Sequence, residues 1–206
     1  MMPIETSVPE RPMASEFLLP IAPVVVMAAV MWIVEIIDSI LDNRLDRFGI
    51  RPRQLDGLDG IVFSPFLHAS FSHLIANTVP FLVLGGVIAI GGAARFVKVT
   101  VIVAVIGGGG TWLTGGSHTL VIGASGLVFG YLLCLLTRGI FARRFSYILG
   151  GVIVLVLYGS VLWGILPTHE GISWQDHLFG AIGGIVAAYA VYRAAPLATA
   201  SVAPNT

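Results

Sequence analysis

The chain has 206 residues, of which 56% are hydrophobic and 11% are charged, and its mean hydropathy is +0.93. A soluble domain carries about 25% charged residues, and a disordered chain combines low hydropathy with high net charge, so the composition excludes both classes. Eleven Lys and Arg residues balance eleven Asp and Glu residues, which leaves no overall positive charge to attract nucleic acid. We therefore expect an integral, multi-pass membrane protein that contacts membrane lipids and binds no nucleic acid.

Six apolar segments fit membrane-spanning helices, which need roughly 20 residues each. In chain order they are 17–37, one within 61–92, two within 99–137, 145–166 and 172–192. In the second region a re-entrant loop is expected before the helix. The third and fourth helices are separated by a polar turn with two glycines at 114–118. The sequence thus predicts an all-α fold, a polytopic bundle of six transmembrane helices.

Basic residues that flank the six segments set the expected orientation, because Lys and Arg are enriched in cytoplasmic loops. With the N-terminus inside, the cytoplasmic side collects Arg11, Arg95, Lys98, Arg138, Arg143, Arg144 and Arg193. We therefore predict a cytoplasmic N-terminal segment over 1–16, a membrane domain over 17–193 and a flexible C-terminal tail over 194–206. Both termini are then cytoplasmic, and the first external loop lies at about 41–60.

The first external loop departs from this charge pattern. It holds arginines interleaved with aspartates, namely Arg44, Arg47, Arg51 and Arg53 with Asp42, Asp46, Asp56 and Asp59. We interpret it as a folded, salt-bridged segment. Glu35 and Asp38, just before it, are expected to mark the exit of the first helix into water.

The histidines fall in one layer of the predicted bundle. His68, His73, His118, His169 and His177 all lie at or near the external ends of the second, fourth and sixth helices. Polar groups at membrane depth are tolerated where they face one another or water, so we expect a wet cavity that opens to the outside. Three or more histidines also leave a zinc site open, but no pair has the tight spacing of known metal motifs, and we predict no metal.

Two polar residues of this layer can meet because of the glycines beside them. Ser125 is followed by Gly126 and Gly130, and His177 is followed by Gly180 and Gly184. Glycines at this spacing let two membrane helices approach closely. Packing the two stripes together would bring Ser125 within reach of His177.

A serine hydroxyl becomes a nucleophile when a base accepts its proton, and imidazole suits that task near neutral pH. His73 and Asn77 are i, i+4 neighbours that project from one helix face, and they could stabilise the oxyanion with the backbone N–H of Ser125. Asp176 precedes His177, but adjacent residues of a helix point about 100° apart. The residues therefore predict a catalytic dyad rather than a triad.

The motifs together resemble the rhomboid family of intramembrane serine proteases. They are His68-Ala-Ser-Phe-Ser-His73-Leu-Ile-Ala-Asn77, Gly123-Ala-Ser125-Gly126, and His177 with Gly180 and Gly184, and the likeness covers about residues 17–193. The resemblance implies a Ser125–His177 dyad, an oxyanion site at His73 and Asn77, and auxiliary roles for His68, Phe129, Gly123 and Gly126. Phe129 matches an aromatic position that stacks on the catalytic histidine.

The resemblance further implies an enzyme that hydrolyses peptide bonds in or near transmembrane segments of protein substrates, without a cofactor, in a bacterial plasma membrane. Two features of many relatives are missing: the first loop has no tryptophan to form a Trp-Arg pair, and no glutamate follows Leu84-Gly85-Gly86.

Other interpretations of the same residues remain. Taken singly, Ser125 could be a packing serine, His177 an interfacial histidine, and His73 with Asn77 an interhelical hydrogen-bond pair. Taken as a whole, the chain could be an inactive rhomboid-like protein that binds transmembrane helices, or a small transporter that uses the polar layer as a solute site. Convergence of four polar groups in one layer favours the protease. The natural substrate and the oligomeric state are not predicted.

Overall fold

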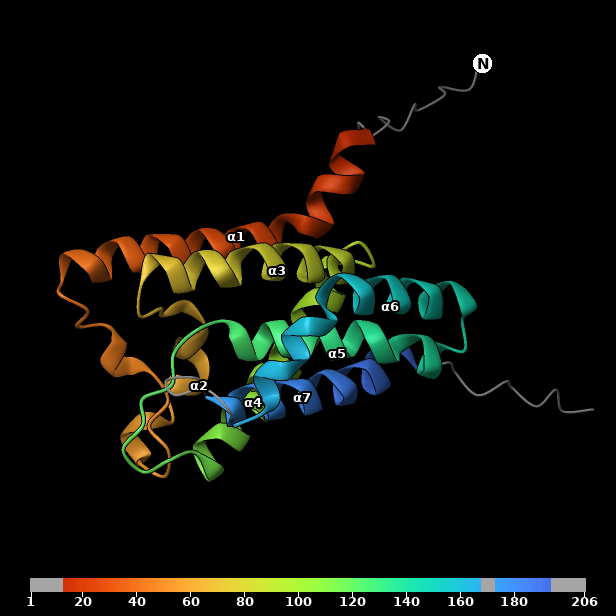
Figure 1. Ribbon diagram of the computed structural model, residues 1–206. Coiled ribbons are helices and arrows are strands. Elements are labelled where there is room, and N and C mark those ends of the chain that lie inside the picture. The colour runs from red at the N-terminus through yellow and green to blue at the C-terminus, as the bar shows by residue number, and fades with distance from the viewer. Residues whose placement is uncertain (1–12, 168–172, 194–206) are drawn as a thin grey trace, which may run out of the picture.

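The computed structural model describes residues 13–167 and 173–193. His169, the predicted tail over 194–206 and most of the predicted segment 1–16 lie outside these residues. Six long helices form the body of the molecule (Figure 1): α1 (Met13–Ile40), α3 (Phe71–Ala89), α4 (Ala93–Thr114), α5 (Ser125–Ala142), α6 (Phe145–Tyr158) and α7 (Trp174–Tyr192). The short elements are α2 (Gly60–Phe63) and the 3-10 segments η1 (Asp46–Phe48), η2 (Leu55–Gly57), η3 (Ser64–Phe66) and η4 (Gly159–Ile165).

Five of the helices, with α6 extended by η4, are long and apolar enough to cross a membrane. The sixth, α7, has 19 residues and packs along α4 and α5, so it runs with the others through the bundle. The described residues form no β-strand. The predicted helical membrane bundle is confirmed. The segment before the second long helix, which the sequence predicts to be a re-entrant loop, folds as α2 and η3.

The centre of the bundle is a tightly packed trio of helices, α4, α5 and α7. A Cβ added at Gly180 of α7 would overlap the carbonyl oxygen of Gly126, and one at Gly184 would overlap that of Gly130. Helix α4 approaches the same residue of α7, since a Cβ at Gly107 would lie 3.3 Å from the Cα of Gly180. The predicted contact between the two glycine stripes is therefore present, and it fixes the separation of α5 and α7.

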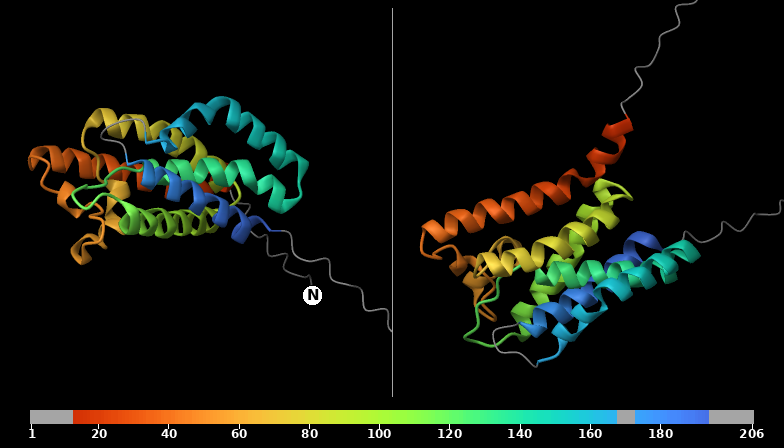
Figure 2. Two further views of the ribbon diagram at one scale, coloured as in Figure 1. Left: turned by 60° about the horizontal axis from the view of Figure 1, so that its bottom comes forward. Right: turned by 45° about the horizontal axis from the view of Figure 1, so that its top comes forward.

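The outer helices are held more loosely. In an apolar stretch of 18 residues taken from each helix, only 11% of the residues of α6 with its extension η4 and 22% of those of α1 are buried, against 56% for α5. Helix α1 lies beside α3, to which it is joined by a hydrogen bond from Trp32 Nε1 to Thr78 Oγ1 at 3.1 Å (Figure 2). Its first turns bend away from the bundle at Pro20 and Pro23, each of which interrupts the helical hydrogen bonds.

The segment between α1 and α2 is folded, as predicted, but a single pair of its Arg and Asp residues forms a salt bridge. Among the described side chains a single ion pair occurs, between Arg51 and Asp56 at 3.0 Å. Arg53 instead donates to the hydroxyl of Ser117 at 2.6 Å. An isolated antiparallel bridge between Ile50 and Val121 attaches this loop to the segment before α5. The loop is therefore fastened to the bundle mainly by backbone and neutral contacts.

The expectation that Glu35 and Asp38 mark the exit into water is also wrong. Their side chains are only 2% and 1% exposed, because the loop folds back over the end of α1. Asp38 Oδ1 accepts a hydrogen bond from the backbone N–H of Leu45 at 2.6 Å. Burial, together with the neighbouring Asp38 and Glu35 carboxylates, raises the pKa of Asp46 in the loop to about 6. This end of α1 therefore carries a compact group of carboxyls.

Candidate active site

The position of Ser125 follows from the backbone just before it. Gly123 adopts φ +119°, a conformation that side-chain-bearing residues rarely take, and its N–H donates to the carbonyl of Ser64 at 2.9 Å. The chain then turns through Ala124 into α5, whose first residue is Ser125. This sharp turn places the hydroxyl at the start of a buried helix, where the first backbone N–H groups have no partners within the helix.

Ser125 and His177 form a hydrogen bond between Oγ and Nε2 at 2.9 Å. The imidazole is 8% exposed and stacks on the ring of Phe129, with the ring centroids 4.1 Å apart and the planes inclined by 13°. The contact predicted from the glycine stripes is thus present. The stack restrains the imidazole from one side while its edge faces the serine.

The second nitrogen of His177 identifies a residue that sequence analysis missed. Nδ1 lies 2.8 Å from the carbonyl oxygen of Gly164 in η4. A carbonyl only accepts, so Nδ1 carries the hydrogen, and Nε2 of the neutral ring is left to accept the proton of Ser125. No side-chain signal could have revealed Gly164, because the group that acts is its backbone carbonyl.

His73 and Asn77 of α3 face Gly123. A Cβ added at Gly123 would lie 2.9 Å from His73 Nε2 and 3.7 Å from Asn77 Nδ2, so glycine at this position leaves room for both polar groups beside the turn. Asn77 also donates to the carbonyl of His73 at 3.2 Å, which holds its amide in place. Both predicted oxyanion residues therefore border the backbone that precedes Ser125.

His68 lies beneath this arrangement and is fully buried. Its Nε2 accepts a hydrogen bond from the N–H of Ala124 at 3.4 Å, and its ring meets that of His73 edge to face at 5.1 Å. Burial, with a smaller contribution from His73, lowers the pKa of His68 to about 4, so this imidazole is neutral at physiological pH. It supports both the turn and His73.

Asp176 does not bind Nδ1 of His177, because the carbonyl oxygen of Gly164 occupies that position. Instead its buried carboxyl accepts a hydrogen bond from Thr111 of α4 at 3.4 Å. The same carboxyl lies over Gly126, where an added Cβ would be 2.5 Å from Oδ2. Asp176 thus bridges α4, α5 and α7 at the level of the dyad.

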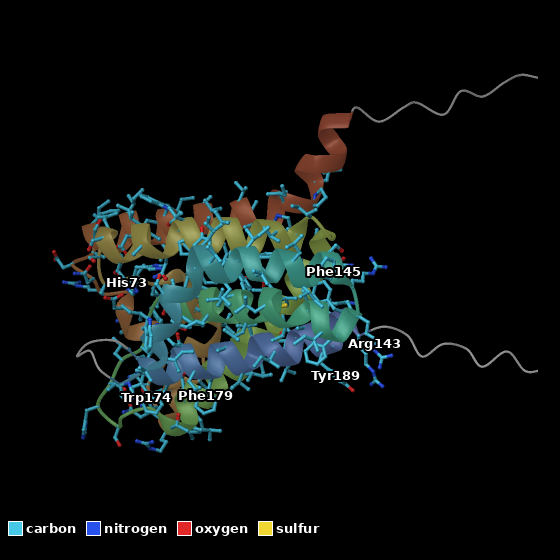
Figure 3. All side chains as sticks on the ribbon, turned by 45° about the vertical axis from the view of Figure 1, so that its right-hand side comes forward. His73, Arg143, Phe145, Trp174, Phe179 and Tyr189 are labelled. Atoms are coloured by element: carbon cyan, nitrogen blue, oxygen red, sulfur yellow. The ribbon has the colours of Figure 1, made fainter. Side chains whose placement is uncertain are left out.

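A cavity of about 550 Å³ lies beside the site. It is bordered by His73, by the extended segment 119–122 and by the first residues of α7 from 173 to 175. Figure 3 places His73 and Trp174 at the same end of the bundle. A cavity is therefore present at the end of the bundle where His73 lies, as the sequence predicted. His118 is exposed in the loop before α5 and is not part of the site.

The described part of the chain brings no three His, Cys, Asp or Glu side chains together in a way that could hold a metal ion. The lone Cys134 is buried within α5. The groups that the structure brings to the site are a hydroxyl, imidazoles, an amide, the Asp176 carboxyl and backbone N–H groups.

Comparison with known proteins assigns the family. The sequence profile of the Rhomboid domain matches residues 56–194. The chain belongs to the rhomboid family. It is 48% identical to the uncharacterized protein Rv1337 of Mycobacterium tuberculosis (strain ATCC 25618 / H37Rv), over 81% of this chain and 72% of that relative. It is 49% identical to the uncharacterized protein ML1171 of Mycobacterium leprae (strain TN), over 78% of this chain and 67% of that relative.

A third relative comes from Bacillus subtilis (strain 168), where it is provisionally named the rhomboid protease YdcA. It is 32% identical over 60% of this chain and 62% of its own length. No solved structure gives a significant match to the chain.

Proposed function

We propose that this rhomboid protein is an intramembrane serine endopeptidase that hydrolyses peptide bonds in or near transmembrane segments of other membrane proteins. The observation that carries the proposal is the chain of contacts from Ser125 Oγ to His177 Nε2 at 2.9 Å and from His177 Nδ1 to the Gly164 carbonyl at 2.8 Å. A nucleophile, a base and a group that orients the base are the three parts that covalent catalysis of acyl transfer needs.

In the first step, Ser125 Oγ attacks the carbonyl carbon of the substrate while its proton passes to His177 Nε2. The hydrogen bond from Nδ1 to Gly164 keeps the ring oriented and stabilises the positive charge that develops on it. His177 then donates the proton to the leaving amine, and the acyl group remains on Ser125. Positioned proton transfer of this kind contributes roughly 10²–10⁴ in rate.

The negative oxygen formed by the attack needs hydrogen-bond donors that are already in place. Asn77 Nδ2, the ring of His73 and the N–H of Ser125 border the Gly123 turn from which the serine projects. Each such donor is worth about 2.7–4 kcal/mol of transition-state stabilisation. Water from the 550 Å³ cavity then hydrolyses the acyl-enzyme with His177 again as the base.

The substrate must reach the dyad from the lipid, because it is itself a membrane helix. We propose that it approaches past α6, the loosest of the spanning helices, and unwinds locally near its external end. Unwinding exposes a peptide carbonyl that a helix keeps hydrogen-bonded, so Gly, Ser or Pro near that end should favour cleavage. The basic residues at the opposite end of the bundle support an orientation in which the site faces the external side of a bacterial plasma membrane. Both termini are then cytoplasmic, and lipids are further partners.

The test is cleavage of a fluorescently labelled single-helix substrate by purified protein in detergent and in liposomes. Ser125→Ala and His177→Ala are expected to lose activity to background, at least about 10³-fold, since the dyad acts as one unit. Ser146→Ala, an exposed serine at the start of α6, serves as the control and should retain full activity.

A fluorophosphonate probe gives a second readout. It should label Ser125, identified by peptide mass, in wild type and in Ser146→Ala. An inactive rhomboid-like protein would bind the helix but show neither turnover nor labelling. Cleavage retained in Ser125→Ala would exclude the proposed nucleophile.

A further inference from the structure

The end of the bundle away from Ser125 carries a cluster of arginine and tyrosine side chains from four helices. Ser125 opens α5 and Arg138 lies in its last turns, so the two are separated by about 20 Å along the helix. Figure 3 shows this end, with Arg143 and Tyr189 opposite His73 and Trp174. The Arg–Tyr cluster consists of Arg95, Arg138, Arg144, Tyr147 and Tyr192.

Arg138 occupies the centre of the cluster. Its guanidinium carbon lies 4.7 Å from the centre of the Tyr147 ring and 6.0 Å from that of Tyr192. The two rings meet edge to face with their centroids 6.0 Å apart. Arg95 reaches the Tyr192 ring from the start of α4 at 5.0 Å, and Arg144 reaches the Tyr147 ring at 5.8 Å. Three guanidinium groups therefore gather around two aromatic rings.

No described carboxylate balances this charge. The single ion pair among the described side chains, Arg51 with Asp56, lies in the first loop at the other end of the bundle. Arg138 Nε is buried and has no hydrogen-bond acceptor. Cation–π contacts hold the guanidinium planes in position but leave their N–H groups free to donate.

The orientation rule for membrane proteins accounts for the number of basic residues here but not for their placement. Exposed residues such as Lys98 and Arg143 satisfy that rule without any aromatic contact. Arg95 and Arg138 are partly buried against tyrosine near one end of α4 and of α5. Planar guanidinium groups without carboxylate partners suit the oxygens of a phosphate group.

We propose that the Arg–Tyr cluster binds the phosphate group of an anionic phospholipid in the membrane leaflet at this end of the bundle. The headgroup phosphate accepts from Arg138 and Arg95, and the acyl chains lie along the exposed apolar surface of α6, which includes Leu149 and Val152. Basic pockets between helix ends are where membrane proteins hold anionic headgroups. The inference does not depend on the proposed protease activity.

The experiment measures lipid binding to the full chain in neutral detergent. Phosphatidylglycerol, phosphatidylcholine and inorganic phosphate are each titrated, bound lipid is counted by native mass spectrometry, and thermal unfolding is followed in parallel. Wild type should retain phosphatidylglycerol in preference to phosphatidylcholine and unfold at a higher temperature with it. Inorganic phosphate should give neither effect.

Three variants locate the site. Arg138→Gln and Arg95→Gln are each expected to weaken phosphatidylglycerol binding about fivefold, the effect of one arginine near an anionic surface. Lys98→Gln removes the same charge three residues from Arg95 on an exposed position of α4, and should bind almost as wild type. If Arg138→Gln does not fold, Arg95→Gln still decides the question.

An equal loss of phosphatidylglycerol binding in Lys98→Gln and Arg95→Gln would show that only the general surface charge matters, and it would overturn the proposal. Equal binding of the two lipids by wild type would do the same. Stabilisation by inorganic phosphate as large as that by the lipid would assign the cluster to a free anion and exclude the lipid.

Discussion

Helices α5 and α6 follow each other in the chain, yet the bundle holds them in very different ways. Helix α5 packs so closely against α7 that a Cβ added at the contact glycines would overlap the neighbouring backbone. More than half of the residues in its apolar stretch are buried. In α6 with its extension η4, only 11% of the residues in the apolar stretch are buried, and the rest are half-buried or exposed. In the proposed enzyme, α5 therefore belongs to the tightly packed part that holds the dyad, and α6 belongs to the loosely packed part.

The difference has a physical reason in the proposed reaction. A nucleophile and its base must be held within a few tenths of an ångström, which needs contacts that cannot slide. A substrate helix must also reach them from lipid, which needs a neighbour that can move. The loose helix still touches the dyad at one point, because its extension η4 supplies the Gly164 carbonyl that orients His177.

The glycine contact between α5 and α7 gives the largest expected effect. Gly184→Ala places a methyl group against the Gly130 carbonyl and should lower the free energy of unfolding by about 3 kcal/mol. Gly109→Ala is the control, because a Cβ there meets nothing within 4 Å. That variant should be neutral or slightly stabilising, since alanine favours helix over glycine. Equilibrium unfolding in mixed micelles measures both, and equal losses would show that the close packing of α5 and α7 is not a source of stability.

The Asp176 bridge ranks next, since it joins the rigid trio at the level of the dyad. Asp176→Ala removes the buried carboxyl that lies over Gly126 and contacts Thr111 at 3.4 Å, so a loss of about 1–3 kcal/mol is expected. The Thr111 hydroxyl itself keeps its 2.8 Å hydrogen bond to the Gly107 carbonyl. The rate of fluorophosphonate labelling at Ser125 should fall together with the stability. Asp176→Asn keeps an acceptor over Gly126 and should recover most of both quantities. If the asparagine variant is as impaired as the alanine variant, charge rather than the bridge is what matters.

A matched pair of valines compares the two regions directly. Val103 of α4 is fully buried against Gly130 and Gly183, whereas Val154, 9% exposed, is one of the two buried residues of α6. Membrane helices associate through packing contacts rather than through removal of apolar surface from water. Val103→Ala should therefore cost on the order of 1–2 kcal/mol through the cavity that it leaves, and Val154→Ala less than half of that. Equal costs would mean that α6 is as firmly packed as the trio.

The smallest effect concerns the loop at the end of α1 and depends on pH. The pKa of Asp46 is about 6 in the folded chain, raised from 3.8 by burial and by the carboxylates of Asp38 and Glu35. The folded state therefore binds the proton more tightly than the unfolded state, and stability falls as pH rises from about 4 to about 6. At pH 7, Asp46→Asn should raise the free energy of unfolding by about 1 kcal/mol, after allowance for the partial exposure of this side chain. The variant should therefore unfold at a higher temperature than wild type.

Thermal unfolding of both proteins across pH 4 to 7 provides the check on Asp46. The two curves should converge at pH 4, where the wild-type carboxyl is protonated. A difference that is constant across this range would contradict the raised pKa.

Much of the candidate site could be predicted from the amino-acid sequence. The glycine spacing after Ser125 and after His177 predicts close packing, and close packing predicts their contact, because two backbones can approach only where side chains are absent. The i, i+4 pair of His73 and Asn77 is equally local. The catalytic roles of these residues stay predictions until activity is measured.

Other features had no local signal. The charges of the first loop suggested ion pairs, but Arg53 lies nearer to Ser117 of a distant loop than to any neighbouring aspartate that would pair with it. Glu35 and Asp38 were expected in water, and only the return of the loop over α1 buries them. Gly164 acts through its carbonyl, which every residue possesses.

The sequence by itself determined the membrane environment, the approximate spans and which polar residues share a layer, because hydropathy and helical periodicity are properties of neighbouring residues. Tertiary structure alone decided which nitrogen of His177 carries the hydrogen, where the carboxyl of Asp176 points and which helix is loose. Those outcomes depend on distances between segments far apart in the chain, and such distances are set by how the whole bundle packs.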